Sequence, residues 1–491
     1  MFQPSKTNNV VSLNRTASND KNDSLDVQYA NYCLNNGFCL ATKDESVVHK
    51  WDGSCWQTVT QDDFETDAFV WIQSSREAKK ASSPLAQRLV KGVPLMLRHH
   101  QKVLPQRPRW VEIVPLKNAY LIMQDGEQSF SIIPPNPEYG MTHCVNASLS
   151  PDELNQQVYI PKSVNKNTLF HQFLESSFPD LEVRSLAQEM MASTILQKNF
   201  QKATVLMGDG NNGKGVLHKI MASVHERTIA KELDHLNDSH DLENIVGATL
   251  ILVDETPESR IHVQRFKSLV SQDIVTINPK GKKAFSYTPI AKWIINGNHH
   301  IVTRDQSYGF WRRIVPIPVN VKITNKIPNL AEQIIEKELK EVIDWLLEGA
   351  VRIIKRGRLL EEHEWPKAVR CEINTAQTSA DSVMAFSEEF ELKINDGESW
   401  VSKEDIYKDY VRYCDDYGLM SVSNPNFFKR LLKTAERQHV AIKERQKSIG
   451  TANGTKRIRQ ISVTYFNASC KLDNSNPVDG IDDVPYNDNG V

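Results

Sequence analysis

The stretch VLMGDGNNGKG contains residues whose types and spacing suit phosphate binding. Gly208, Gly213 and Lys214 follow the pattern G-x-x-x-x-G-K directly after an apolar run. Glycines let a backbone wrap around a phosphate with its N–H groups pointing inward, and a following helix adds its positive amino end. A lysine at this position reaches the β- and γ-phosphates of a nucleotide. The candidate ATP-binding residues are therefore Gly208, Asp209, Gly210, Asn211, Asn212, Gly213, Lys214, Gly215 and Val216.

Position 215 departs from the usual pattern, in which Ser or Thr follows the lysine. Gly215 has no hydroxyl for Mg²⁺, but it keeps its backbone N–H. We therefore expect the phosphate cradle to survive without a metal ligand at this position. A glycine-rich turn in an unrelated protein could share this much of the pattern, so the residues downstream decide between the two interpretations.

An acidic pair, Asp254 and Glu255, ends the apolar run LILV. One carboxylate can bind Mg²⁺ while the next polarises an attacking water. Acidic residues at strand ends are often only solvated, but a pair that follows a phosphate loop at this distance favours nucleotide hydrolysis.

Two further segments add polar candidates. KWIINGN ends in Asn298, which could orient the water or sense the γ-phosphate, and Asn296 is the competing candidate. GFWRRI contains Arg312 and Arg313. Such a pair is either a solvated or ion-paired surface feature, or it contains a finger that stabilises transition-state charge in a neighbouring subunit.

These segments occur in the order and spacing of the superfamily 3 helicases. From about Trp51 to Phe466 the chain resembles the primase–helicases of phages, plasmids, phage satellites and poxviruses. The resemblance implies an AAA+-like ATPase that uses ATP and Mg²⁺ and forms a homo-hexameric ring around DNA. It also implies a role for each candidate: phosphate-loop lysine for Lys214, Mg²⁺ ligand for Asp254, water activation for Glu255, sensor for Asn298, and trans-acting finger for Arg313 with Arg312 second.

The resemblance also aligns NPKGKKAF with a hairpin that grips one DNA strand in the ring's channel. The candidate channel residues are Lys282 and Lys283, with Lys280 beside them. Positive charges can follow phosphates, and the aromatic residues Phe285 and Tyr287 could stack on bases. The alternative is a surface turn with solvated lysines. Gln272 stands where the family usually has Gly, which is a departure in the local turn.

The elements that must position these residues alternate between apolar strands and helical segments. Continuous apolar strands with helices between them predict an α/β domain with a parallel sheet. Asp52-Gly53 predicts a hairpin turn, and a single long amphipathic helix is expected after Asn329. We divide the chain into a disordered leader (1–25), a small α+β domain (26–162), a helical collar (163–199), the ATPase core (200–325), a helical extension (326–395), a winged helix (396–468) and an acidic disordered tail (469–491).

The winged helix is predicted from two helices, the second of them basic, followed by a basic strand pair. Its candidate contacts with duplex DNA at a replication origin are Lys429, Arg430 and Lys433. A helical packing module with a solvated basic face is the alternative.

Composition limits the remaining possibilities. The 491 residues are 40% hydrophobic and 24% charged with a net charge of −2, which excludes a wholly disordered chain and a globally basic coat protein. No apolar run is long enough to span a bilayer, no signal peptide is evident, and the seven scattered cysteines fit neither a disulfide framework nor a zinc ribbon. We therefore expect a cytoplasmic protein without a membrane partner.

The sequence predicts an ATP-dependent replicative DNA helicase and origin-binding initiator of a phage, plasmid or phage satellite. It would bind single-stranded and duplex DNA, with host replication proteins or a separate primase as further partners. One alternative is an ATP-regulated DNA-binding switch or defence protein that does not unwind. Another is a bifunctional primase–helicase, although no carboxylate cluster for primer synthesis stands out near the amino end.

Overall fold

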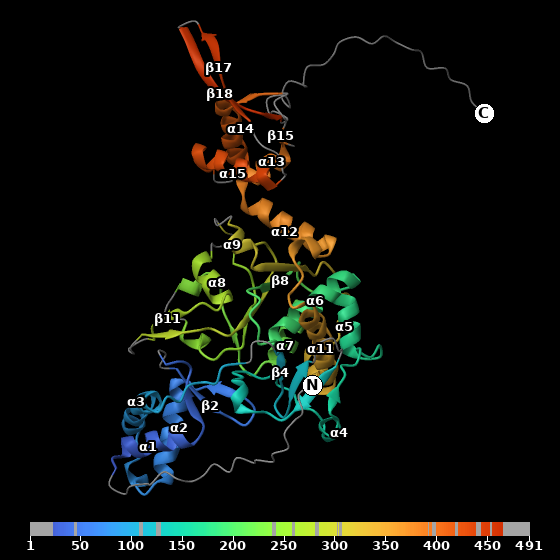
Figure 1. The fold of residues 1–491 in the computed structure, drawn as a ribbon. Coiled ribbons are helices and arrows are strands. Elements are labelled where there is room, and N and C mark those ends of the chain that lie inside the picture. Colours follow the sequence, from blue (N-terminus) through green and yellow to red (C-terminus); the bar gives the residue numbers. More distant parts are fainter. Residues whose placement is uncertain are drawn as a thin grey trace, which may run out of the picture. The chain divides into compact units, whose positions relative to one another are not determined.

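The computed structural model in Figure 1 comprises two compact units, residues 1–373 and 374–491. It describes residues 23–43, 47–107, 111–123, 129–237, 242–257, 261–279, 284–301, 303, 307–390, 392–394, 399–417, 421–437, 443–451 and 454–464. The predicted acidic tail and nearly all of the predicted leader lie outside these ranges. The division between the units lies inside the predicted helical extension. Among the described helices, none combines the length and the apolar character needed to cross a membrane.

A five-stranded sheet lies at the centre of the first unit. Its order is β14-β8-β13-β10-β9, and every neighbouring pair is parallel. The strands are β8 (Ala203–Met207), β9 (Thr228–Ala230), β10 (Leu250–Val253), β13 (Lys292–Gly297) and β14 (Ile314–Pro318). All residues of β8, β10 and β13 are buried, as expected for apolar strands covered on both faces. The predicted α/β class with a parallel sheet is confirmed, and β9 and β14 are additional strands.

Helices cover both faces of this sheet. Trp293 and Asn296 point to opposite faces of β13 because side chains alternate along a strand. Trp293 packs edge-on against Phe266 of α8 (Val263–Val270), with ring centroids 5.7 Å apart. Asn296 contacts His218 of α7 (Lys214–Val224) at 3.1 Å. The segments after β8, β10 and β13 therefore leave the sheet at one edge, between α7 on one face and α8 on the other.

Helices α5 (Leu169–Ser177), α6 (Leu181–Ile195), α10 (Leu330–Lys337) and α11 (Leu339–Arg356) contact one another or α7. Helix α9 (Tyr308–Trp311) instead packs against α8, where Phe310 contacts Phe266. Helix α12 (Lys367–Ala380) crosses the division between the units. The prediction of a single helix after Asn329 was wrong, because the chain breaks at Glu338. The Glu338 carboxylate accepts hydrogen bonds from the backbone N–H groups of Leu169 and Phe170, at 3.0 and 2.8 Å. The Glu338 side chain at this break therefore caps the start of α5.

The amino-terminal elements form two further sheets. Helices α1 (Leu25–Asn35), α2 (Gln61–Ser74) and α3 (Ser83–His99) pack with the antiparallel strands β1 (Phe38–Leu40), β2 (Val48–Trp51) and β3 (Trp56–Thr58). The second sheet has the order β4-β5-β6-β7, made of β4 (Ile113–Pro115), β5 (Tyr120–Met123), β6 (Phe130–Ile133) and β7 (Val158–Tyr159), and α4 (Pro151–Leu154) precedes its last strand. The predicted turn at Asp52-Gly53 is confirmed: it joins β2 to β3, and Gly53 has φ +102°.

Glu226 joins the amino-terminal sheets to the central one. It follows α7, and its carboxylate accepts hydrogen bonds from Gln57, from the Lys117 ammonium and from the backbone N–H of Cys144. Burial would raise the pKa of Glu226, but the hydrogen bonds from Lys117 and Gln57 outweigh it and lower the pKa below its usual value. The carboxylate is therefore charged and fully engaged at neutral pH.

His225, the neighbour of Glu226, makes the first unit sensitive to acid. Its ring lies 3.0 Å from Thr194 Oγ1 and 3.3 Å from Thr249 Oγ1, and burial lowers its pKa to about 3. Between that value and the ordinary pKa of about 6.5, the unfolded chain binds a proton that the folded chain does not. This contribution to stability is complete above pH 6.5 and falls by up to about 1.4 kcal/mol per pH unit below it.

We therefore expect His225→Gln to reduce the loss of unfolding free energy between pH 7 and pH 5 by about 2 kcal/mol. Denaturant unfolding at the two pH values measures this difference. His363→Gln is the control, since that side chain is 75% exposed. Equal pH dependence in wild type and His225→Gln would contradict the expectation.

After the end of α12, the described residues of the second unit form helices and two small sheets. The helices are α13 (Ser382–Glu389), α14 (Lys403–Asp416) and α15 (Asn424–Arg437). β16 (Val401–Ser402), β17 (Glu444–Thr451) and β18 (Gly454–Ile461) form a sheet in the order β16-β18-β17, and β15 (Lys393–Ile394) pairs with β19 (Val463–Thr464). The predicted helix pair and strand pair are present. α13 joins their core through Val383 and Phe386, so the unit begins before the predicted boundary at residue 396.

Candidate nucleotide site and nucleic-acid contacts

The loop of residues 208–213 leaves β8 and enters α7 with unusual backbone angles. Gly208, Asn211 and Gly213 have φ values of +148°, +63° and +96°. A Cβ on Gly208 would lie 2.8 Å from Asn212 Nδ2 and closer still to the carbonyl oxygen of Val319. Asn212 also donates a 2.7 Å hydrogen bond to that carbonyl, which ties the loop to the end of β14. The loop is thus fixed by its own glycines and by a neighbouring strand.

Most of the other candidates in this loop and at the start of α7 face solvent. Asp209, Gly210, Asn211 and Gly215 are exposed, and Val216 is half-buried. A Cβ on Gly215 would have no atom within 4 Å, so the position next to Lys214 faces open space.

Lys214 is the first residue of α7 and is buried. Its ammonium donates to the backbone carbonyl oxygens of Gly208 and Gly297 and to Asn298 Oδ1, the last at 3.0 Å. Burial lowers the pKa of Lys214. The positive charge therefore lies inward, at the carboxyl ends of β8 and β13.

Asn298 connects Lys214 to the acidic pair. Its Nδ2 donates a 3.0 Å hydrogen bond to Glu255 Oε1, so three predicted residues from three segments form one chain of contacts. Between the two candidate asparagines, Asn298 is the one that lies beside Lys214 and Glu255. Asn296 faces His218 instead.

His218 is a site residue that the sequence prediction missed. It is 4% exposed, and its Nδ1 lies 3.6 Å from Asp254 Oδ1, whereas the Asp254 side chain is 85% exposed. Burial lowers the pKa of His218 to about 4, so the ring is neutral at pH 7. Its position four residues after Lys214 could have indicated it, because such residues share a helix face.

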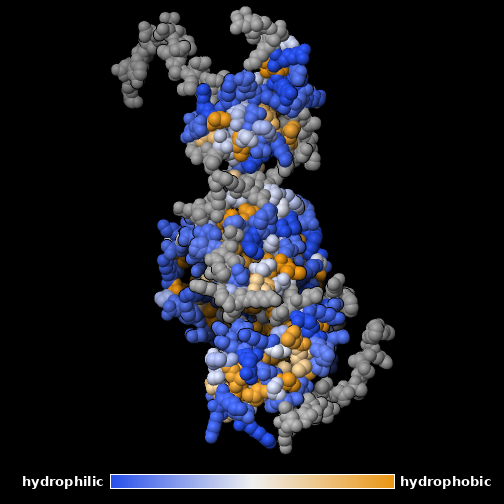
Figure 2. All heavy atoms as spheres, turned by 90° about the vertical axis from the view of Figure 1, so that its left-hand side faces the viewer, coloured by the Kyte–Doolittle hydropathy of each residue, from blue (hydrophilic) through white to orange (hydrophobic). Residues whose placement is uncertain are grey.

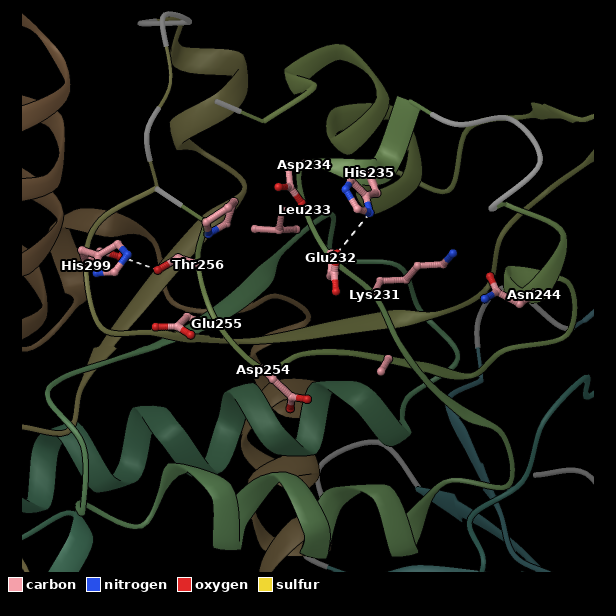
Figure 3. Close-up of a pocket in the computed structure, with 12 residues that line it drawn as sticks. Lys231, Glu232, Leu233, Asp234, His235, Asn244, Asp254, Glu255, Thr256 and His299 are labelled. Carbon is pink, nitrogen blue, oxygen red and sulfur yellow. Dashed lines mark hydrogen bonds and ion pairs between the residues drawn. The ribbon is translucent and has the colours of Figure 1, made fainter. Parts of the chain in front are cut away.

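Asp254 and Glu255 line an open cavity of about 750 Å³, shown in Figure 3. The cavity lies at the carboxyl ends of β9, β10 and β13, the usual place for a ligand in an open α/β sheet. Its volume is within the range of small-molecule sites, about 300–1,000 Å³. Glu232, Asp234 and His235 lie across it from the acidic pair, and the sequence prediction did not include them.

The two arginines lie at the amino ends of the strands of the sheet, whereas the loop lies at their carboxyl ends. β14 runs parallel to β8 with Ile314 opposite Ala203, so Arg313 precedes the strand while the loop follows Met207. Arg313 is 9% exposed and donates to Ser271 Oγ through Nε and Nη2, at 2.9 and 2.6 Å. Arg312 Nη2 donates to Gln201 Oε1 at 2.9 Å. The structure therefore places neither arginine near the Lys214 of its own chain.

The candidate channel residues Lys280, Lys282 and Lys283 lie outside the described residues. The strands on either side, β11 (Val275–Ile277) and β12 (Phe285–Tyr287), form an antiparallel pair. Gln272 takes the left-handed conformation that the family's glycine would favour, with φ +59°. Tyr287 is 3% exposed and accepts a hydrogen bond from the Gly247 N–H, so its predicted availability for stacking on bases was wrong.

In the second unit the predicted DNA contacts differ in availability. Lys429 is exposed, but Arg430 Nη1 lies 3.2 Å from Asp381 Oδ1, and that carboxylate also caps α13 through the Val383 N–H. Lys433 lies in α15, but its side chain is not described. The strand pair adds exposed cations that the prediction did not name individually: Arg445, Lys447, Arg457 and Arg459.

Comparisons with known proteins match only part of the chain by sequence. No curated protein sequence matches it. By structure it is similar to "The apo structure of NrS-1 C terminal region (305-718)", with 14% identity over 73% of this chain and 95% of that one and a TM-score of 0.40. A second structure, "The A form apo structure of NrS-1 C terminal region-CTR", covers 72% and 97% at 14% identity with a TM-score of 0.39. Residues 206–313 match a "Family of unknown function (DUF5906)". This range contains all the candidates for nucleotide binding and hydrolysis, from Gly208 to Arg313.

Proposed function

We propose that this chain is an ATP-dependent DNA helicase of the superfamily 3 type, and a replication initiator of a phage, plasmid or phage satellite that works as a hexameric ring. The observation that carries the proposal is the contact chain Lys214–Asn298–Glu255 at the carboxyl edge of a parallel sheet. A buried ammonium, an amide and a carboxylate at the end of a glycine-rich loop suit the hydrolysis of a nucleoside triphosphate. The order of the sequence motifs supports the helicase assignment.

In the proposed reaction a water oxygen bonds to the γ-phosphorus and the bond to the β–γ bridging oxygen breaks, which gives ADP and phosphate. Glu255 would orient the water and accept its proton. Lys214 would exchange its backbone carbonyl partners for phosphate oxygens and balance their growing charge. Asn298, already bonded to both residues, would keep them in register.

Mg²⁺ would bind at the exposed Asp254 carboxylate, and His218 behind it would fix the orientation of that carboxylate. The ion would neutralise phosphate charge when bound. The residues present fit this role, since the Asp254 carboxylate is 85% exposed and lines the cavity, where it can offer an oxygen ligand.

Gly215→Ser is expected to keep ATP hydrolysis and to tighten binding of the Mg²⁺–nucleotide complex severalfold. The new Cβ meets no atom within 4 Å, serine supplies the hydroxyl that the loop lacks, and the substitution replaces a glycine in a helix. Titration of a fluorescent nucleotide at several Mg²⁺ concentrations measures the change. Loss of hydrolysis would show that glycine is required at this position.

Arg313 stays our proposed trans-acting finger. To reach a neighbouring nucleotide it would have to exchange its bonds with Ser271 and Gly309 for phosphate contacts. Arg312, which is half-buried, is the second candidate.

The second unit is proposed to bind origin duplex as a winged helix. The order of three helices and the sheet β16-β18-β17, with exposed cations on α15 and on the strand pair, supports this role. Lys280, Lys282 and Lys283 are proposed to contact single-stranded DNA.

Lys429→Ala and Arg430→Ala should separate binding from stability. We expect Lys429→Ala to weaken duplex binding and leave thermal unfolding unchanged, because it removes an exposed charge. Arg430→Ala should lower the stability of the second unit by about 1–3 kcal/mol, because it leaves the buried Asp381 carboxylate without its cation. Thermal unfolding and duplex titration of both variants measure this, and equal melting temperatures would contradict the structural role of Arg430.

The assay that tests the proposed function is strand displacement on forked DNA by the full chain, with ATP and with a non-hydrolysable analogue. We expect displacement with ATP alone and faster ATP hydrolysis when DNA is added. Hydrolysis without displacement would favour the ATP-regulated switch, and absence of both would overturn the proposal.

A further inference from the structure

A second region of positive charge lies in the amino-terminal elements, away from every candidate described above. From residue 78 to residue 111 the chain contains no Asp or Glu but eight basic residues: Lys79, Lys80, Arg88, Lys91, Arg98, Lys102, Arg107 and Arg109. In the whole chain Lys and Arg number 59 against 61 acidic residues. This segment is therefore a local concentration of positive charge in a nearly neutral protein.

Helix α3 arranges part of this charge on one face. Arg88, Lys91, Leu95 and Arg98 are exposed and are spaced by three, four and three residues, so they form a stripe along the helix. The opposite face is packed into the amino-terminal core by Ala86, Leu89, Val90, Val93 and Leu97. The burial of the apolar side therefore holds the stripe outward. Helix α3 lies on the left-hand side of Figure 1, and Figure 2 is turned so that this side faces the viewer.

The charges of the stripe are only partly compensated. Arg88 Nε lies 3.1 Å from Asp26 Oδ1, and Arg98 Nε donates to the Lys43 carbonyl at 3.0 Å. Within the described ranges Lys91 has no carboxylate partner. Like charges three residues apart on a helix, such as Arg88 and Lys91, destabilise it slightly, and a bound polyanion would offset that repulsion.

We propose that the exposed face of α3, defined by Arg88, Lys91 and Arg98, binds the phosphate backbone of a nucleic acid. From Arg88 to Arg98 the helix rises about 15 Å, which matches about four phosphates of one DNA strand. Among its described residues the exposed face of α3 has no Phe, Tyr or Trp for stacking on bases, so its contacts with nucleic acid are to the phosphate charge and not to the sequence. Membrane binding is disfavoured because the apolar face of α3 is buried, and Leu95 is its one large apolar side chain that is strongly exposed.

The test compares two double variants of the full chain that each lose two positive charges. Lys91→Ala with Arg98→Ala changes the stripe, whereas Lys337→Ala with Lys355→Ala changes exposed lysines on α10 and α11. Titration of labelled duplex and single-stranded DNA over a range of salt concentrations gives the slope of log Kobs against log[salt]. The stripe variant should lower this slope by about two on at least one DNA form, while the control leaves it near the wild-type value.

Lys91→Glu is a second variant that changes a single exposed side chain and guards against misfolding of the double variant. Its DNA affinity should fall at low salt, while ATP hydrolysis without DNA stays unchanged. The proposal is overturned if both stripe variants keep the wild-type slope and affinity. It is also overturned if they lose binding to vesicles of anionic phospholipid but not to DNA. Because the readout is DNA binding without ATP, failure here leaves the proposed hydrolysis site untouched.

Discussion

Replacing Lys214 with alanine is expected to lower the rate of ATP hydrolysis by at least 100-fold. Its ammonium is the cation at the junction of the loop, Asn298 and Glu255, and removing one preorganised donor from such a site costs about 10²–10³ in rate. Phosphate release under saturating ATP measures the effect. Lys219→Ala is a matched control on the same helix, because Lys219 is exposed and pairs with Glu332.

Glu255→Gln tests the other end of the same contact chain. The amide oxygen of glutamine can still accept the hydrogen bond from Asn298, but it cannot act as a base at neutral pH. We expect nucleotide binding to persist while hydrolysis falls to the level of Lys214→Ala. Turnover near the wild-type rate in either variant would remove the assignment of ATP hydrolysis to this site.

Gly213→Ala is expected to abolish nucleotide binding and to lower the stability of the first unit. Gly213 has φ +96°, which costs a non-glycine residue about 1–3 kcal/mol. The added Cβ would lie 2.9 Å from Phe173 Cε2 and closer still to Ser177 Oγ, both on the buried side of α5. The loop must shift to make room, and its N–H groups would then point away from the phosphates.

Gly215→Ala provides the matched control for this effect. It lies two residues further along the same loop and helix, and its new Cβ has no atom within 4 Å. Nucleotide titration and thermal unfolding should place Gly215→Ala near wild type and Gly213→Ala far from it. If both alanine variants bind nucleotide equally well, the loop conformation described here is not the one that binds nucleotide.

The three strands that precede candidate site residues were predicted from the sequence, whereas the two edge strands of the sheet were not. β8, β10 and β13 are apolar runs followed by polar candidates, and all three lie inside the sheet. β14 and β9 are the two edge strands. β14 contains Pro316 and Pro318, which argue against a central strand but are tolerated at an edge, and β9 has only three residues.

Several side chains could not be placed from the sequence because their partners are distant along the chain. Glu338 breaks a regular helical pattern to cap α5, which begins 169 residues earlier. Arg313 and Arg430 were predicted to act outward, but their guanidinium groups bond to Ser271 and Asp381. Apolar periodicity describes how each helix packs, and it carries no information about which distant polar group a side chain will meet.

Glu226 has a practical consequence for the design of shorter fragments. A fragment that began at residue 163, the expected start of the helical collar, would lack Gln57, Lys117 and Cys144, which all donate to that carboxylate. Glu226 would remain beside the last turn of α7 with its charge uncompensated, at the other end of the helix that begins with Lys214. The smallest autonomous fragment that contains the candidate nucleotide site should therefore retain the amino-terminal sheets.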